Sequence, residues 1–172
     1  GVETEDRRVP ARNGAPEVAV RIYRPAGGDA PLPALLWMHG GGWVLGSIEL
    51  DDLMAAQLAK DVGCAVVSVD YRLAPENPFP APLDDCYAAL EWVAAESAAL
   101  RVDPARIAVG GGSAGGNLAA ALALRARDQG GVMPSFQLLI YPSLDDTNVV
   151  QASETVPDNL FFSHEAPAMD GD

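Results

Sequence analysis

The stretch IAVGGGSAGGN carries glycines and a serine whose spacing allows two kinds of chemistry. Gly110, Gly112 and Gly115 form the pattern G-x-G-x-x-G, which cradles the phosphates of a dinucleotide. Gly111, Ser113 and Gly115 form the pattern G-x-S-x-G, in which a sharp turn between a strand and a helix presents a nucleophilic serine. The surrounding sequence must decide between a phosphate cradle and a nucleophile turn.

The dinucleotide pattern lacks the acidic residue that should accompany it. That residue is expected about 20 positions further on, at the end of the next strand. The acidic pair after the next predicted strand, Asp145 and Asp146, lies too far along the chain and beyond a proline. At least two predicted strands also precede the motif, whereas the fingerprint favours the first strand-turn-helix unit. We therefore do not interpret these glycines as a dinucleotide site.

The nucleophile pattern is accompanied by the features that it requires. Small residues flank Ser113, as a sharp turn demands, and the helix that follows offers unpaired N–H groups to a developing oxyanion. A second set of donors should come from a loop after an earlier strand. The motif HGGGW at residues 39–43 follows such a strand, and this pairing is known from lipases and esterases. Together the two motifs favour a serine nucleophile over a purely structural glycine turn.

The elements that position these motifs alternate between strands and helices. Apolar or alternating stretches predict strands at residues 17–25, 34–40, 64–71, 106–111 and 135–142. Helices are predicted over 50–61, from Pro82 onward, and from Ser113 to the glycines at 130–131. The stretch Leu118–Leu124 is apolar all round, so we expect the last helix to be buried. Such alternation predicts an α/β fold with a mostly parallel sheet covered by helices on both faces. Both glycine turns then lie at carboxyl ends of strands, where ligands bind.

The amino-acid composition limits the kinds of partner that we expect for the chain. Its 172 residues are 49% hydrophobic and 20% charged, which predicts one globular domain. The net charge is −13, and Lys60 is the only lysine, so we expect neither nucleic acid nor an anionic membrane as a partner. The N-terminus is too polar for a signal peptide, and no apolar stretch has the length of a membrane span. These features favour a cytoplasmic location.

Neither a metal site nor a disulfide framework is predicted. Cys64 opens an apolar stretch and Cys86 falls in a predicted helix, which is typical of buried free thiols. The sequence contains no C-x-x-C motif and no His/Cys cluster with metal-ligand spacing.

Four motifs between Val18 and Asp146 resemble one known family. They read WMHGGGWVLGS, VVSVDYRLAPENPFPAPLDD, RIAVGGGSAGGNLAAALALRARD and LLIYPSLD, in that order. They resemble the bacterial hormone-sensitive-lipase-like carboxylesterases, a branch of the α/β-hydrolases. The resemblance implies an α/β-hydrolase fold and an enzyme that hydrolyses short- to medium-chain carboxylic esters through an acyl-enzyme. It implies a small-molecule ester as substrate and no cofactor.

The resemblance also implies roles for individual residues. Ser113 is the expected nucleophile, and the backbone N–H groups of Gly41, Gly42 and Ala114 are the expected oxyanion hole. His39 is expected to shape the loop and not to act as the base.

Two further positions complete the comparison with the family. The stretch YRLAPE, residues 71–76, looks like the segment that supports the active site in this family. Gly112 departs from the family, which usually has aspartate there, and we expect this to alter the stability of the turn more than the chemistry.

A catalytic triad would need an acid and then a histidine after the serine. The sequence has two histidines, His39 and His164. Asp145 or Asp146 followed by His164 has the correct order, but a parallel crossover takes about 30 residues, more than this gap allows. We expect His164 to be a loop residue.

The resemblance then places the acid and the histidine beyond Asp172, and the family's cap helices before Gly1. Residues 1–172 would be a single partial catalytic domain, truncated at both ends, lacking the last strands and the N-terminal cap, and inactive alone. The alternative is a non-catalytic small-molecule binder with the same fold. The strand at 135–141 would form an edge without charged residues, so we expect marginal stability and pairing or aggregation through it.

Overall fold

A single six-stranded sheet organises the protein. The computed structural model describes residues 1–11, 14–28 and 30–145. The strands are β1 (Val2–Val9), β2 (Val18–Pro25), β3 (Leu32–Met38), β4 (Ala65–Asp70), β5 (Val102–Gly112) and β6 (Phe136–Ile140). Their order across the sheet is β1-β2-β4-β3-β5-β6. Strands β4, β3, β5 and β6 run parallel, whereas β1 and β2 are antiparallel to their neighbours, which confirms the predicted mostly parallel sheet.

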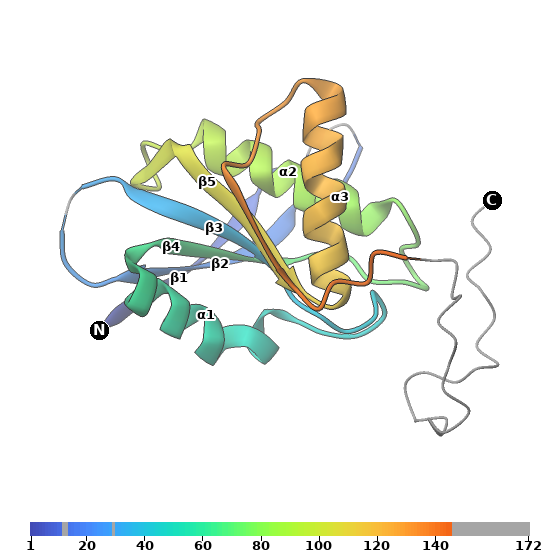
Figure 1. Cartoon of the computed structure of the whole chain (residues 1–172), viewed down its shortest axis with the longest axis horizontal. Helices are drawn as coiled ribbons and strands as arrows, with labels where there is room; N and C mark the ends of the chain where they lie inside the picture. Colours follow the sequence, from blue (N-terminus) through green and yellow to red (C-terminus); the bar gives the residue numbers. More distant parts are fainter. Residues whose placement is uncertain (12–13, 29, 146–172) are drawn as a thin grey trace.

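Helices cover both faces of this sheet (Figure 1). One face carries α1 (Asp52–Leu58), which is preceded by the short helix η1 (Ile48–Asp51) and followed by the π-helical turn η2 (Ala59–Gly63). The other face carries α2 (Ala81–Ala95) and α3 (Ala114–Gln129). No helix in the described part of the chain is long and apolar enough to cross a membrane.

The core consists of two layers because side chains of a strand alternate between its faces. Along β3, Leu36 and Met38 pack in the layer under α2 and α3. Leu35 and Trp37 pack in the layer under α1. A strand buried on both faces reads as a continuous apolar run, and this is why the sequence predicts β3 correctly.

The first strand, β1, is missing from the elements predicted by sequence. It pairs antiparallel with β2 in a continuous register from Val2 opposite Pro25 to Val9 opposite Val18. Its sequence VETEDRRV is mostly charged because β1 is an edge strand with most of its side chains in solvent. An edge strand of this kind carries no apolar alternation by which it could be recognised.

The helix α3 is buried along a stripe and not all round. Leu118, Ala119, Leu122 and Ala126 face the core, but Leu124 is 53% exposed. The expected burial of this helix against the sheet and a neighbouring helix is therefore confirmed, with Leu124 as the exposed exception within Leu118–Leu124.

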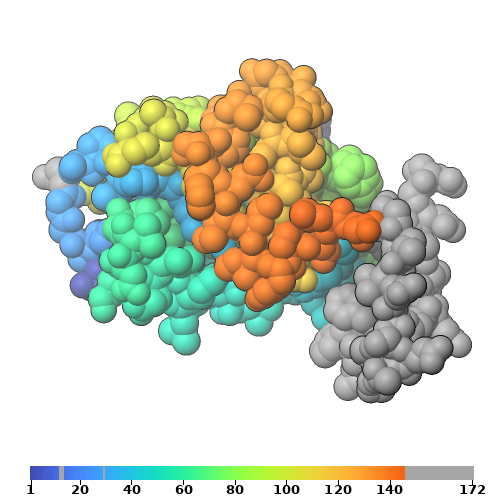
Figure 2. Space-filling model, viewed as in Figure 1, coloured from blue at the N-terminus to red at the C-terminus, as the bar shows by residue number. Residues whose placement is uncertain are grey.

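At the opposite edge from β1 lies β6. Within the described residues it pairs with β5 on one side, and no described strand pairs with its other side. Phe136 on this strand is 62% exposed. Figure 2 shows β6 and the loop after it in orange, beside the green surface of α1. The predicted self-association through this strand stays a prediction.

Candidate active site

Ser113 occupies a strained turn between β5 and α3. Its backbone has φ 54° and ψ −118°, a region that residues with a side chain rarely adopt. The main chain is held on both sides: the Ser113 N–H donates to the Ile140 carbonyl at 3.0 Å, and the Ser113 carbonyl accepts from the Asn117 N–H at 3.1 Å. The hydroxyl makes no capping hydrogen bond to α3 and is half-buried. The turn therefore fixes the backbone and leaves the side chain available for reaction.

The glycines around Ser113 allow the backbone of α3 to approach β3 and β5 closely. A Cβ atom on Gly115 would lie 2.0 Å from the Met38 carbonyl oxygen, and one on Gly111 would lie 2.4 Å from the Gly115 carbonyl. A Cβ on Gly112 would meet its nearest atom, Cε2 of Tyr141, at an ordinary 3.5 Å. Packing therefore requires glycine at both glycine positions of the nucleophile pattern. In the dinucleotide pattern Gly110 is also tightly packed, with a Cβ 2.9 Å from the Leu138 carbonyl oxygen, whereas Gly112 has room for a side chain.

This difference gives a test of the turn. We expect Gly115→Ala to lower the free energy of unfolding by about 3 kcal/mol, because the new methyl group overlaps a main-chain carbonyl that cannot move freely. Gly112→Ala is the matched control and should change the stability by less than about 0.5 kcal/mol. Urea unfolding of both variants measures the difference, and equal stabilities would contradict the packing described for the turn.

The loop after β3 places unpaired N–H groups beside this turn. Gly40 adjoins Ser113, since a Cβ on Gly40 would lie 3.7 Å from the Ser113 Cβ. Gly41 and Gly42 follow with φ of 126° and 60°, and the loop closes when the Leu45 N–H donates to the Gly41 carbonyl at 2.9 Å. Gly41 lines the same cavity as Ser113, whereas Gly42 does not line it.

The N–H groups of the three residues predicted to form the oxyanion hole have no hydrogen-bond partner in the described part of the chain. In residues 1–11, 14–28 and 30–145, no hydrogen-bond acceptor faces the N–H of Gly41, Gly42 or Ala114. The N–H of Ala114 belongs to the first turn of α3, where unpaired donors and the helix dipole favour negative charge.

His39 lies beneath this loop and shapes it. The side chain is 1% exposed, and its Nδ1 lies 2.7 Å from the Gly40 carbonyl oxygen. The Tyr71 ring stacks on it at 4.2 Å, and the Tyr71 hydroxyl donates to the His39 carbonyl at 2.6 Å. Burial raises the pKa of Tyr71, so its hydroxyl stays a proton donor. Gly46 packs against the imidazole, where a Cβ would lie 2.3 Å from Nδ1. This burial supports a role in loop shape and not in proton transfer.

The segment 71–76 joins the loop to α2. The Ala74 N–H donates to the Trp43 carbonyl at 2.9 Å, and the Arg72 guanidinium donates to Asp85 on α2, with Nη2 and Oδ1 2.7 Å apart. The Asp85 carboxylate is 1% exposed and also accepts the Arg72 N–H at 2.9 Å. These hydrogen bonds raise the pKa of Arg72. The ion pair thus anchors the segment that supports the loop.

The two cysteines in the described residues do not offer a reactive thiol. Cys64 and Cys86 are free and buried, as predicted, and burial raises the pKa of both thiols. No group of three or more His, Cys, Asp or Glu residues in this part of the chain could hold a metal ion.

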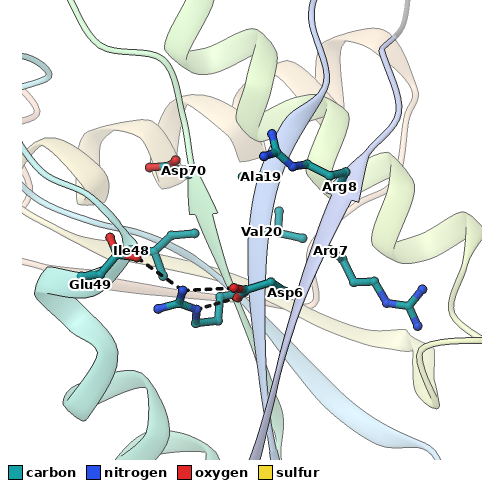
Figure 3. A pocket seen from close by; sticks show the side chains of 9 residues that line it. Asp6, Arg7, Arg8, Ala19, Val20, Ile48, Glu49 and Asp70 are labelled. Atoms are coloured by element: carbon teal, nitrogen blue, oxygen red, sulfur yellow. Dashed lines mark hydrogen bonds and ion pairs between the residues drawn. The ribbon is translucent and has the colours of Figure 1, made fainter.

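A second, charged pocket lies over β1, β2 and η1 (Figure 3). Its central guanidinium, Arg21, is paired with Asp6 at 2.6 Å, with Asp52 at 3.1 Å and with Glu49 at 3.4 Å. These hydrogen bonds raise the pKa of Arg21 and lower that of Asp6. Arg21 and its three carboxylates satisfy one another and tie the edge of the sheet to α1, so we assign this group no chemistry.

Two residues near the site were not singled out from the sequence. The Asn117 amide donates to the Ser143 carbonyl at 2.8 Å and so joins α3 to the loop after β6. Tyr141 lies in that loop with a positive φ of 38°, next to Gly112. The sequence feature that could have identified Tyr141 is its position at the carboxyl end of a predicted parallel strand, where ligands bind. The signal for Asn117 was only its position one turn after the serine.

The base and the acid of a triad are not among the described residues. His39, buried under the loop, is the one histidine within them. Asp145 is exposed at their end, and Asp146 and His164 lie outside them. The described residues thus bring together Ser113, Gly41 and Ala114, with Gly42 next in the loop.

The sheet order, the strained serine turn and the glycine loop define an α/β-hydrolase. Residues 35–170 match the family described as the alpha/beta hydrolase fold, and the chain belongs to this family. It is 48% identical over 138 residues to carboxylesterase NlhH of Mycobacterium tuberculosis, covering 80% of this chain and 43% of that protein. It is 43% identical over 129 residues to ethyl acetate hydrolase of Pseudomonas putida, covering 73% and 41%.

Solved structures show the same relationship. A bacterial heroin esterase has a TM-score of 0.83 and 49% identity, with 85% of this chain and 46% of that chain covered. The thermostable carboxylesterase EstE1, cloned from a metagenomic library, has a TM-score of 0.82 and 47% identity, with 87% and 50% covered. The chain spans less than half the length of the curated relatives named above. The predicted α/β-hydrolase fold and the resemblance to carboxylesterases are confirmed.

Proposed function

We propose that this protein hydrolyses carboxylic esters and that Ser113 is its nucleophile. The observation that carries the proposal is the strained Ser113 turn beside the unpaired N–H groups of Gly41, Gly42 and Ala114. The names of the relatives, carboxylesterase and ethyl acetate hydrolase, support the same reaction.

In this mechanism the Ser113 Oγ attacks the ester carbonyl carbon and gives up its proton to a general base. The carbonyl oxygen becomes negatively charged and accepts hydrogen bonds from the N–H groups of Gly41, Gly42 and Ala114. Collapse of this intermediate releases the alcohol and leaves an acyl-enzyme, which water then hydrolyses. We place the general base outside the described residues, since His39 is buried and engaged beneath the loop.

The proposed substrates are esters with short to medium chains. The cavity beside Ser113 has a volume of about 270 Å³ within the described residues, which is enough space for a short alkyl substituent. Turnover of p-nitrophenyl butanoate by the intact protein, expressed from its whole reading frame, is the first test. Binding of the ester without turnover would favour the non-catalytic binder instead. The cytoplasmic location stays a prediction of the sequence.

The oxyanion hole can be tested at Gly41. The residue has φ 126°, and a Cβ there would lie 2.0 Å from the Leu45 carbonyl oxygen, so Gly41→Ala must displace the loop. We expect kcat to fall by about 100-fold to 1,000-fold with a smaller change in KM. Gly27→Ala is the matched control, because Gly27 also has a positive φ of 88° but lies in the β2–β3 turn. Equal activity of the two variants would contradict the assignment.

A further inference from the structure

The cavity beside Ser113 lies between β3, α1 and the end of β6. It has a volume of about 270 Å³, and its lining residues are Trp37, Gly40, Gly41, Leu50, Asp51, Met54, Gly112, Ser113, Ile140 and Tyr141. Figure 2 shows α1 and the segment around β6 side by side on this face. Because Gly41 and Ser113 belong to its wall, a group bound there would be attached to the reacting carbonyl or adjacent to it.

The cavity wall is mainly apolar. The Trp37 indole is buried, and its N–H donates to the Asp51 carboxylate at 2.7 Å, so this polar pair is already satisfied. Leu50 is 70% exposed and Tyr141 is 78% exposed, although both are large apolar side chains. Met54 is partly buried between them and the sheet. A mainly apolar cavity whose wall contains the nucleophile is typical of a substrate subsite.

A backbone hydrogen bond joins the wall of this cavity to the turn that carries Ser113. The Ile140 carbonyl accepts the Ser113 N–H at 3.0 Å, and the next residue, Tyr141, has a positive φ of 38°. Such strain persists only where the surrounding structure holds it, and it clusters at functional sites. The backbone at the base of Tyr141 is therefore tied to the backbone of Ser113.

Gly112 forms the part of the wall opposite this ring. Its φ is not positive, and a Cβ on it would lie 3.5 Å from Tyr141 Cε2, so neither the backbone nor the packing requires glycine. The missing side chain leaves free space between the turn and the Tyr141 ring, which any larger residue would fill.

We propose that Gly112 sets the size of an apolar subsite in which a short apolar substituent of the ester lies against Trp37, Met54 and Tyr141. This substituent is the alkyl chain of either the acyl group or the alcohol group of the ester, because both chains are apolar and would make the same contacts. The proposal rests on the proposed ester hydrolysis and adds the residues that select the substrate.

The test uses two opposite variants of the intact protein and two ester series. Gly112→Val fills the subsite and Met54→Ala enlarges it, while Ala105→Val adds bulk at an exposed position toward the other end of β5. One series runs from p-nitrophenyl acetate to hexanoate and the other from methyl to butyl acetate. The readout is the kcat/KM of the longest ester divided by that of the shortest within each variant, which cancels any unfolded fraction.

In one series, we expect Gly112→Val to lower this ratio by about fourfold for each methylene group that no longer fits. Met54→Ala should raise the ratio and Ala105→Val should leave it unchanged. The series that responds identifies the acyl or the alcohol side. Hydrolysis with unchanged ratios in both series would overturn the subsite while leaving the esterase proposal intact.

If the parent protein hydrolyses neither series, the esterase proposal fails and the subsite is tested by binding. Binding of ethyl butanoate is then measured by isothermal titration calorimetry. Weaker binding by Gly112→Val than by Ala105→Val supports the subsite, and equal affinities, or no binding by the parent, overturn it.

Discussion

Replacing Ser113 by alanine in the intact protein lowers the turnover of p-nitrophenyl butanoate by about a million-fold. Loss of a serine nucleophile has this effect in other serine hydrolases because no other group can form the acyl-enzyme. The fold should survive, since the main chain of Ser113, which makes the hydrogen bonds to Ile140 and Asn117, is unchanged. Steady-state kinetics with protein checked by circular dichroism measure the loss.

Ser135→Ala provides the matched control. Ser135 lies just before β6, at the end of the sheet away from the turn, and its hydroxyl donates to the Ile107 carbonyl at 3.1 Å. Its removal should change turnover by less than about twofold. A Ser113→Ala protein that keeps ordinary esterase activity would show that another residue attacks the ester.

A large loss of stability, together with a loss of activity, is expected from Asp85→Ala. The Asp85 carboxylate is 1% exposed and holds the Arg72 guanidinium and the Arg72 N–H, so its loss leaves a charged group and a main-chain donor without their acceptor. We expect the free energy of unfolding to fall by about 3 kcal/mol. Activity should fall as well, because the segment 71–76 that Arg72 anchors contacts the glycine loop through Ala74.

Asp84→Ala separates this effect from a general loss of charge on α2. Asp84 is the neighbouring residue and pairs with Arg125, but its side chain is 38% exposed. An exposed ion pair contributes at most about 1 kcal/mol. Urea unfolding of both variants measures the difference, and similar losses for Asp84→Ala and Asp85→Ala would contradict the role of the buried pair.

The sequence predicts the parts of the fold that are buried on both faces or that need glycine. The strand β3 reads as an apolar run, and the glycines at 111 and 115 occupy positions where a Cβ would overlap main-chain atoms. These signals are local, because the physical constraint acts on the residue itself. They suffice to place Ser113 on a turn and the HGGGW motif at a strand end.

The parts that sequence missed depend on long-range contacts or lie in solvent. The strand β1 is charged because its outer edge is exposed, and Leu124 is exposed because α3 contacts its neighbours on one side. The cavity joins Trp37, Met54 and Tyr141 from three separate elements, so no short pattern contains it. The stacking of Tyr71 on His39 likewise joins residues far apart in the chain.

Covalent labelling tests most directly whether Ser113 is the nucleophile. The intact protein is treated with an alkyl fluorophosphonate and digested with trypsin, which cuts after Arg106 and Arg125. Ser113 is the only residue with a hydroxyl, thiol or amine side chain in the released peptide, residues 107–125. We predict one phosphonyl adduct, on this peptide, formed at a rate that falls when p-nitrophenyl butanoate competes, and absent from Ser113→Ala. An unmodified 107–125 peptide in protein that hydrolyses the ester, or an adduct on a different peptide that abolishes hydrolysis, would contradict the account.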